Sequence, residues 1–301
     1  MSEILNVKTV ADYHEWMGFA PRNPLVSIVD YSGLPPKIPT RKLYGFYAIF
    51  LKEQKCGEIR YGRQDYDYQE GTILFVSPGQ VYGPTNINYP ICGDGYALLF
   101  QPDIMRATHN EKCLRNYTFF KYSSNEALHV SKEERECLVE CLNRIKFELE
   151  HPNDEYSNIL IADSIKMFLD YCSRFYDRQF RFRKSANRSI LVRLEDIVDK
   201  FIHEDKSKRR KLLTVQECAD MLNISPNYLS DLMRTETGNT VLSYIHAKII
   251  EQSKLELAIN NMTITEIAYS LGFEYAHHFT RLFKKIEGCT PTEYRRRLFQ
   301  K

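Results

Sequence analysis

Two short segments in the last third of the 301-residue chain each carry polar side chains at the spacing of one helix face. These side chains are Asn227, Ser230, Asp231 and Arg234 in the first segment, and His277, Thr280, Arg281 and Lys284 in the second. Side chains of these types hydrogen-bond the edges of DNA bases in the major groove, and the cationic ones also pair with backbone phosphates. The pattern therefore predicts non-covalent binding, in which no covalent bond is made or broken.

Residues that could support catalysis or hold a metal do not form a recognisable set. The eight cysteines include no C-x-x-C pair, and we interpret them as small buried apolar residues. In the first part of the chain His14, His109 and His129 are never two residues apart, as a metal site on a strand would require. No phosphate loop and no nucleophile with a matching base is found. The sequence predicts no catalytic residue, no metal and no cofactor.

The two segments belong to an internal repeat. Thr214 to Gly238 aligns with Thr263 to Gly288 when the second copy is given one extra residue. The matched pairs are Thr214 with Thr263, Glu217 with Glu266, Ala219 with Ala268, Leu222 with Leu271, Ile224 with Phe273, Leu229 with Phe279, Leu232 with Leu282, Met233 with Phe283 and Gly238 with Gly288. The repeat indicates that one supersecondary unit is built twice.

Each copy contains the start and stop signals of two helices. Both begin with T-x-x-E, a capping box whose Thr and Glu side chains satisfy amides of the first helical turn. The first helix is predicted to stop at Asn223 or Gly272, residue types that tolerate a left-handed backbone. The second is predicted to start at Ser225-Pro226 or near Glu274 and to end at a glycine. This order of elements is the helix-turn-helix plan.

The second helix of each copy should bury one face. The buried residues are predicted to be Leu229, Leu232 and Met233 in the first copy, and Phe279, Leu282, Phe283 and Ile286 in the second. Their burial turns the polar side chains outward, where a major groove could meet them. The alternative is a plain helical bundle with solvated polar faces, and the matched caps, cores and glycines favour helix-turn-helix units.

The residues between the copies, Val241 to Asn260, are predicted to form one long helix. The second helix of each copy would then be the recognition helix that enters the DNA. A rigid helix between the copies would place the two recognition helices about 34 Å apart, in adjacent major-groove segments on one face of the duplex. The arrangement predicts a DNA site made of two blocks.

Charge and composition divide the chain. Through Asp177 there are 19 Lys and Arg against 24 Asp and Glu, and after it 22 against 15. This asymmetry suggests a basic domain that meets a polyanion and an acidic domain with another role. The predicted fold class is α+β multidomain. Residues 1–177 hold a strand-rich part (about 20–125) and a helical hairpin (about 131–176), 178–188 are a linker, and 189–301 are all helical.

The strand-rich part should be a sandwich or small barrel, because short strands alternate with Gly and Pro turns. The predicted strands are Val26–Asp30, Tyr44–Leu51, Glu58–Tyr61, Thr72–Val76 and Tyr96–Phe100. Apolar residues at helical spacing on both sides of His151-Pro152-Asn153 predict the hairpin. No apolar run approaches the roughly 20 residues of a membrane helix, and no signal peptide is recognised, so a cytoplasmic location is predicted.

The second copy resembles the AraC/XylS family of bacterial transcription regulators. The matching residues are Ile267-Ala268, Gly272-Phe273, Phe279, Arg281, Phe283-Lys284-Lys285, Gly288, Pro291 and Tyr294-Arg295. Ser225 to Ser230 and Glu236 to Gly238 of the first copy also fit. The resemblance implies a domain of seven helices whose third and sixth enter DNA. It also implies an N-terminal cupin-like β-barrel and a helical hairpin used for dimerisation.

The resemblance also assigns contacts with double-stranded DNA. The base-facing residues are Asn227, Ser230, Asp231 and Arg234 in the first copy, and Ala276, His277, Thr280 and Arg281 in the second. Ser225, Lys284 and Lys285 are assigned to the DNA backbone. Asp231 departs from the family, whose members often carry a basic or polar side chain there. It could accept a hydrogen bond from cytosine but would be repelled by phosphate.

For the N-terminal domain the resemblance implies a small-molecule effector. Candidate pocket residues are Tyr44, Phe46, Tyr61, Tyr82 and Tyr96, and ordinary barrel packing explains them equally well. The arm that carries Trp16 could cover such a pocket or touch the DNA-binding domain. The protein is predicted to be a homodimeric activator that recruits RNA polymerase. The alternatives are a DNA-binding protein without an effector and, less favoured, a cupin-type enzyme fused to a DNA-binding domain.

Overall fold

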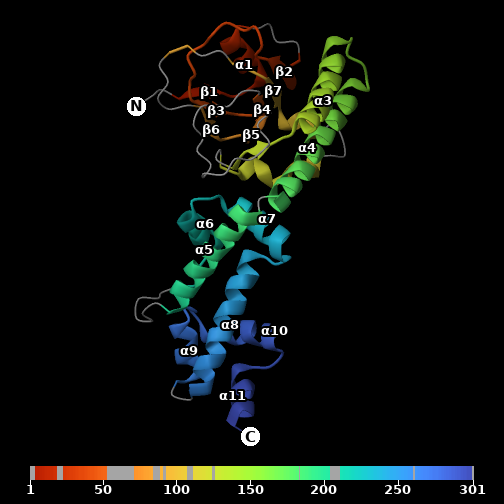
Figure 1. Cartoon of the computed structure of the whole chain (residues 1–301). Helices are drawn as coiled ribbons and strands as arrows, with labels where there is room; N and C mark the ends of the chain where they lie inside the picture. The colour runs from red at the N-terminus through yellow and green to blue at the C-terminus, as the bar shows by residue number, and fades with distance from the viewer. Residues whose placement is uncertain are drawn as a thin grey trace. The chain divides into compact units, whose positions relative to one another are not determined.

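The computed structural model describes residues 4–18, 23–52, 71–83, 89–90, 93–106, 111–123, 126–182, 184–203, 211–259 and 262–299 (Figure 1). The chain forms two compact units, Met1–Gln179 and Phe180–Lys301. The first unit contains the strands, and the second is helical, which confirms the predicted division into a sheet-rich part and an all-helical part.

The described strands of the first unit form two sheets. They are β1 (Leu5–Val7), β2 (Val26–Asp30), β3 (Lys42–Tyr44), β4 (Tyr47–Lys52), β5 (Thr72–Val76), β6 (Val81–Tyr82), β7 (Tyr96–Phe100) and β8 (Leu128–His129). One sheet has the order β1-β3-β6 and the other β2-β7-β4-β5-β8. Neither sheet closes on itself within the described ranges, so a closed cupin-like barrel is not confirmed. The predicted strand Glu58–Tyr61 lies outside the described residues.

Three predicted strands, β2, β5 and β7, have the expected bounds, but the prediction of one strand over Tyr44–Leu51 was wrong. The chain turns at Gly45, whose amide donates a hydrogen bond to the carbonyl oxygen of Val7 at 2.8 Å. A Cβ atom at Gly45 would collide with the backbone of Lys8, so a larger residue could not approach β1 in this way. The turn separates β3 from β4.

The N-terminal arm folds onto the sheets of its own unit. Its helix α1 (Val10–Met17) buries Tyr13, whose ring centroid lies 6.4 Å from those of both Tyr44 and Phe46. Burial raises the pKa of Tyr13 to about 12, because the phenolate would lose its hydration. Lys42 lies over the ring of Trp16, with Nζ 3.5 Å from the centroid. The arm thus covers an aromatic core.

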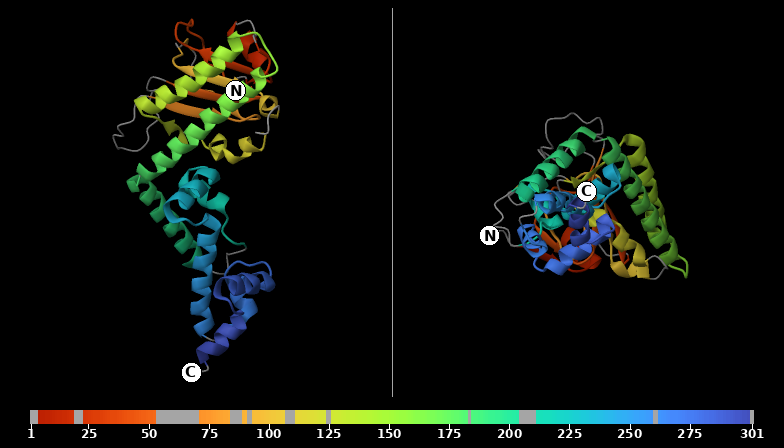
Figure 2. Two further views of the ribbon diagram at one scale, coloured as in Figure 1. Left: turned by 90° about the vertical axis from the view of Figure 1, so that its right-hand side faces the viewer. Right: turned by 90° about the horizontal axis from the view of Figure 1, so that it is seen from below.

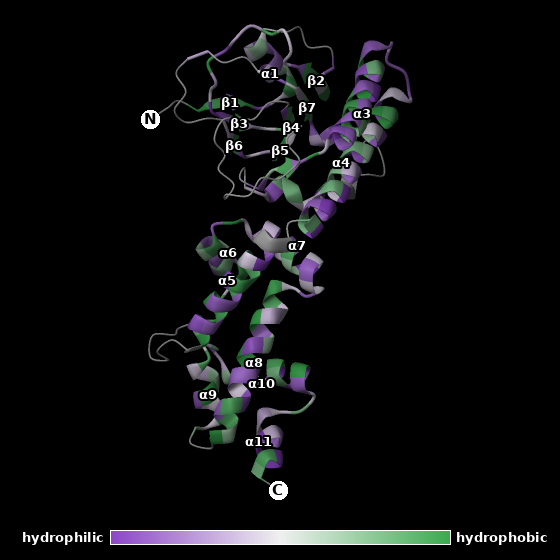
Figure 3. Ribbon diagram, viewed as in Figure 1, coloured by the Kyte–Doolittle hydropathy of each residue, from purple (hydrophilic) through white to green (hydrophobic). Residues whose placement is uncertain are grey.

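The predicted helical hairpin is present. It follows α2 (Pro102–Arg106) and the 3-10 helices η1 (Glu111–Asn116) and η2 (Thr118–Lys121), and consists of α3 (Lys132–Glu150) and α4 (Ser157–Phe182). Figure 2 shows both helices crossing the sheet, and Figure 3 shows apolar and polar residues interleaved along them. The buried side chains include Leu138, Leu142, Ile145, Ile161, Ile165, Phe168 and Cys172.

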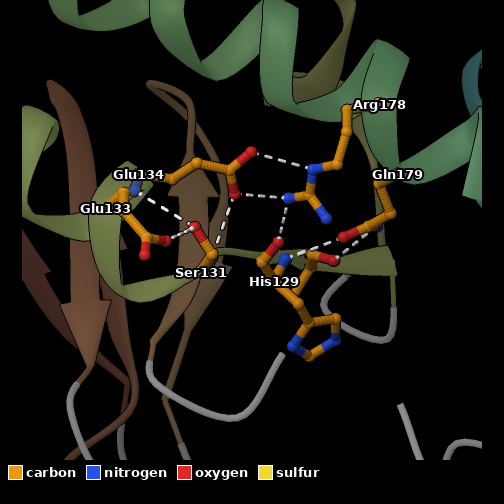
Figure 4. Close-up of polar contacts among 7 residues, drawn as sticks. His129, Ser131, Glu133, Glu134, Arg178 and Gln179 are labelled. Atoms are coloured by element: carbon orange, nitrogen blue, oxygen red, sulfur yellow. Dashed lines mark hydrogen bonds and ion pairs between the residues drawn. The ribbon is translucent and has the colours of Figure 1, made fainter. Parts of the chain in front are cut away.

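A polar network ties the end of α4 to the strand β8 and the start of α3 (Figure 4). The Arg178 guanidinium donates to both carboxylate oxygens of Glu134, at 2.9 and 2.7 Å, and to the carbonyl oxygen of His129 at 2.7 Å. The Gln179 side chain accepts the His129 amide at 2.8 Å and donates to the carbonyl of Ala127 at 3.2 Å. A bidentate pair in a partly buried place has a defined geometry, so the hairpin is fixed to the sheet.

The stretch predicted as a linker, 178–188, is helical on both sides of residue 183, which lies outside the described residues. Helix α4 ends at Phe182 and α5 (Lys184–His203) begins directly afterwards. Arg, Lys, Gln and Ala all have good helix propensity, so a segment without an apolar period can still be helical when its neighbours are packed.

Seven helices, α5 to α11, make up the described part of the second unit. After α5 come α6 (Val215–Leu222), α7 (Pro226–Thr237), α8 (Val241–Ile259), α9 (Ile264–Ser270), α10 (Ala276–Glu287) and α11 (Pro291–Phe299). The long helix α8 has α6 and α7 at one end and α9 to α11 at the other (Figure 2). Residues of both repeat copies and of α8 share one hydrophobic core.

Candidate nucleic-acid interface

The first repeat copy has the predicted local structure. Thr214 caps α6 in a capping box, accepting the Glu217 amide at 3.2 Å while the Glu217 carboxylate accepts the Thr214 amide at 2.9 Å. Helix α6 ends at Asn223 in a left-handed conformation (φ 57°, ψ 41°), and the Ile224 amide donates back to the carbonyl of Ala219 at 3.1 Å. Ser225 then caps α7. Hydrogen bonds from the Ile224 amide and to the Ser225 cap therefore close the turn between the two helices.

The second copy repeats this geometry. Thr263 and Glu266 form the capping box of α9, and the Phe273 amide donates to the carbonyl of Ala268 at 3.0 Å. Gly272 has φ 90°, so it takes the place of Asn223. One difference is the start of α10, which has Tyr275 as its N-cap and no side-chain cap, one residue after the predicted Glu274. Both second helices end at a left-handed glycine, Gly238 or Gly288.

The capping box of α6 should make stability depend on pH. Hydrogen bonds from Lys211 and Thr214 lower the pKa of Glu217 from 4.5 to about 2. The folded state thus favours the carboxylate, and this contribution is present above pH 4.5 and is lost as the pH falls to about 2. We expect Thr214→Ala to lower the free energy of unfolding at pH 7 by about 1 kcal/mol.

Urea unfolding of the wild type and Glu217→Gln, followed at pH 7, 4.5 and 2.5, tests this dependence. The difference in stability between the two proteins should shrink as the pH falls through this range, since protonation removes the carboxylate from the wild type as well. A difference that stays constant from pH 7 to pH 2.5 would show that the Glu217 charge does not support the cap.

The apolar faces of the two recognition helices are buried largely as predicted. Leu229, Leu232 and Met233 on α7 are at most 3% exposed, and Phe279 and Phe283 on α10 are fully buried. Leu282 is partly buried against the same core. The prediction for Ile286 was wrong, because its side chain is 42% exposed. It lies near the end of α10, where helical periodicity continues beyond the surface that the core can cover.

The side chains predicted to face DNA bases lie on the outer faces of α7 and α10, except for Ala276, which packs against the hydrophobic core. Arg234, His277 and Arg281 are exposed, and Asn227, Ser230, Asp231, Ala276 and Thr280 are half-buried. The hydroxyls of Ser230 and Thr280 donate to carbonyl oxygens one turn earlier, Pro226 at 2.7 Å and Ala276 at 3.1 Å. Both hydroxyl oxygens keep an acceptor position for a base amino group.

Among the residues predicted to contact the DNA backbone, Lys284 and Lys285 are exposed on the last turn of α10. Ser225 is only 7% exposed, and its hydroxyl accepts the Tyr228 amide at 3.2 Å as the N-cap of α7. A cap of this kind orients the first amides of α7, so any phosphate contact at this place would come from the helix N-terminus as a whole.

The two recognition helices differ in charge. Helix α7 carries Asp231 and Glu236 against Arg234, whereas α10 carries Arg281, Lys284 and Lys285 against Glu287. Because cations near phosphates raise DNA affinity, the charges on α10 suit a phosphate backbone better than those on α7 do. The following helix α11 adds the basic run Arg295 to Arg297.

Two exposed residues that adjoin the predicted set were not named from the sequence. Tyr275 and His278 lie at the start of α10 next to His277, with ring centroids 5.6 Å and 4.2 Å from that of His277. Their signal in the sequence was the group of aromatic side chains of Tyr275, His277 and His278 at the helix start, a position from which recognition helices reach base edges.

The structure brings together only part of the predicted effector pocket. Tyr44 (3% exposed) and Phe46 (0%) are packed in one core with Tyr82, whereas Tyr96 is not part of that cluster. Tyr61 lies outside the described residues. A cavity of about 220 Å³ beside β5 and β6 has Tyr82 in its lining, together with Phe119, Tyr122, Glu126 and Tyr176. A second, of about 380 Å³, lies between β2 and α3.

No cluster of three or more His, Cys, Asp and Glu side chains suited to a metal ion occurs in the described ranges. None of the described helices is both long enough and apolar enough to cross a membrane.

The second unit is similar to known helix-turn-helix proteins. A helix-turn-helix domain family model matches residues 218–297. The Tn10 transposon protein TetD of Escherichia coli is 36% identical over 120 residues, which are 40% of this chain and 78% of TetD. The arabinose operon regulatory protein of Escherichia coli (strain K12) is 36% identical over 81 residues, 27% of this chain and 28% of that protein. The transcriptional regulator YtdP of Bacillus subtilis (strain 168) is 35% identical over 101 residues, 34% of this chain and 13% of that protein.

The match to the first relatives is partial, since the chain covers between 13% and 51% of their length. The second unit thus contains two capped helix-turn-helix units that share one core with the long helix α8, and the helix-turn-helix family model matches across both units. The chain belongs to the AraC/XylS family, which confirms the resemblance seen in the sequence.

Proposed function

We propose that the protein is an effector-responsive activator of transcription that binds, as a homodimer, to a DNA site of two blocks for each protomer. The observation that supports this most strongly is the pair of matched helix-turn-helix units, whose apolar faces share one core with α8 while their polar faces remain at the surface. A duplex of B-form DNA offers adjacent major-groove segments at about 34 Å, the separation that such a pair would read.

In this proposal the eight base-facing residues named from the sequence supply specificity. Lys284, Lys285 and the helix N-termini supply most of the affinity, through phosphates. Arg281 is the strongest candidate for a bidentate contact with guanine, because its guanidinium is exposed on the outer face of α10. The protein would act in the cytoplasm, where its DNA-bound form would recruit RNA polymerase.

The first unit is proposed to be a cupin-like effector domain. The cavity beside β5 and β6 supports it, since its aromatic and polar lining suits a small molecule. The competing function is effector-independent DNA binding. It is favoured by the packing of Tyr44 and Phe46, which fill the core that a ligand was predicted to enter.

Dimerisation is proposed to use the hairpin of α3 and α4. Large apolar side chains are exposed around the loop that joins these helices, namely Phe147 (58%), Tyr156 (59%), Ile159 (43%) and Leu160 (47%). Exposed apolar residues gathered in one region are typical of protein–protein contacts.

Selection of bound sequences from random duplex DNA by the full-length protein tests the proposal. We expect enrichment of a motif with two blocks about one helical turn apart, and a steep fall of affinity with salt. Transcription from the selected site, with and without a library of small molecules, then separates an effector-responsive activator from an effector-independent one. No enriched motif would refute sequence-specific reading.

A further inference from the structure

The helix α8 holds the second helix-turn-helix unit through polar contacts as well as apolar packing. The Glu256 carboxylate, on a residue only 5% exposed, accepts a hydrogen bond from the hydroxyl of Ser270 at 2.9 Å. Lys254 pairs with Glu287, Nζ to Oε1, at 2.8 Å. Ser270 is the last residue of α9 and Glu287 the last of α10. Two residues of α8 thus contact both helices, α9 and α10, of the second helix-turn-helix unit.

These contacts are shielded from water, which gives them a defined geometry. Ser270 is 8% exposed, and the side chains of Lys254 and Glu287 are 21% and 19% exposed. A buried carboxylate depends on its hydrogen bonds because it has lost its hydration. An ion pair in such a place resists rearrangement more than a fully exposed one.

A second lysine of α8, Lys248, forms ion pairs with a different helix, α5. Lys248 lies 2.9 Å from the Glu195 carboxylate and 3.2 Å from that of Asp199. Both carboxylates are on α5, which is not a recognition helix. Lys248 is 31% exposed at its side chain, close to the value for Lys254, so the two lysines form a matched pair for experiment.

We propose that Lys254, through Glu287 of α10, and Glu256, through Ser270 of α9, are positioning residues that hold the second helix-turn-helix unit on α8 and so permit one spacing between the two blocks of the DNA site. The inference rests on the proposed function, since both recognition helices must meet one duplex. One inserted base pair moves the second block by about 3.4 Å and turns it by roughly a tenth of a helical turn. A rigidly held α10 cannot follow this change, whereas a loosened α10 can.

The test uses the full chain and the duplex selected by the wild type, remade with one base pair inserted or deleted between the blocks. For the wild type we expect affinity to fall by about tenfold or more on either altered duplex. For Lys254→Met combined with Ser270→Ala we expect that loss to shrink to about threefold. Thermal unfolding followed by circular dichroism checks that the variant is folded, and Lys254→Met and Glu287→Gln, each alone, replace it if it is not.

Lys248→Met is the matched control, and it should keep the spacing preference of the wild type. Variants at Lys254 that retain the full spacing penalty would overturn the inference, as would a Lys248→Met protein that relaxes it equally. A wild type that selects two blocks but tolerates every spacing overturns the inference and leaves the proposed function standing. A wild type that selects no sequence refutes both.

Discussion

Replacing Phe279 with alanine is expected to lower the free energy of unfolding of the helical unit by about 3–5 kcal/mol. Phe279 is fully buried at the start of α10, with its ring centroid 5.4 Å from that of Phe273 and 5.7 Å from that of Phe283. Removing the ring loses apolar burial and leaves a cavity that neighbouring aromatic rings cannot fill. Because this loss rivals the whole stability of a small domain, DNA binding by the second copy should fail as well.

Urea unfolding followed by the helical circular dichroism signal measures this effect. Ile286→Ala on the same helix is the control, and with a side chain already 42% exposed it should cost less than about 1 kcal/mol. The chain has one tryptophan, Trp16, in the other unit, so its fluorescence transition should keep its midpoint. Equal destabilisation by the two substitutions would show that α10 is not packed as described.

Replacing Arg281 with alanine is expected to weaken binding to the selected DNA by about 1–3 kcal/mol and to leave binding to random DNA nearly unchanged. Arg281 is exposed on α10, one turn beyond His277 and away from the buried ring of Phe283. A guanidinium there can donate two parallel hydrogen bonds to guanine, so its loss should relax specificity at one base pair.

Lys284→Ala is the companion variant. It should weaken selected and random DNA to similar extents and lower the dependence of log affinity on log salt by about one, as expected for one lost phosphate contact. Titrations by fluorescence anisotropy at several salt concentrations measure both variants. Equal losses on both DNAs for Arg281→Ala would assign Arg281 to the DNA backbone.

The helix-turn-helix units could be predicted closely because their signals are local. A capping box needs Thr214 and Glu217 only three residues apart, and a left-handed turn needs only the type of residue at Asn223 or Gly272. The same signals recur in the second copy, so each supports the other. The bounds of β2, β5 and β7 were likewise set by short runs of β-forming residues between turn residues.

Other features depended on neighbours that are distant in the sequence. An apolar run across Tyr44–Leu51 reads as one strand, and only the approach of β1 shows why it turns at Gly45. Aromatic side chains such as Tyr44 and Phe46 suit a ligand pocket or a packed core equally well. In the structure they are buried in one core with residues of α1.

The sequence by itself therefore determined the class of the protein, the two recognition helices and the residues on their outer faces. All three follow from interactions within a few residues, where helical geometry sets which side chains share a face. Tertiary structure alone decided the exposure of Ile286 and the contacts of Lys254 and Glu256 with α10 and α9. Those contacts join residues 33 and 14 positions apart, and no local pattern specifies them because they form only when α8 and the second copy pack together.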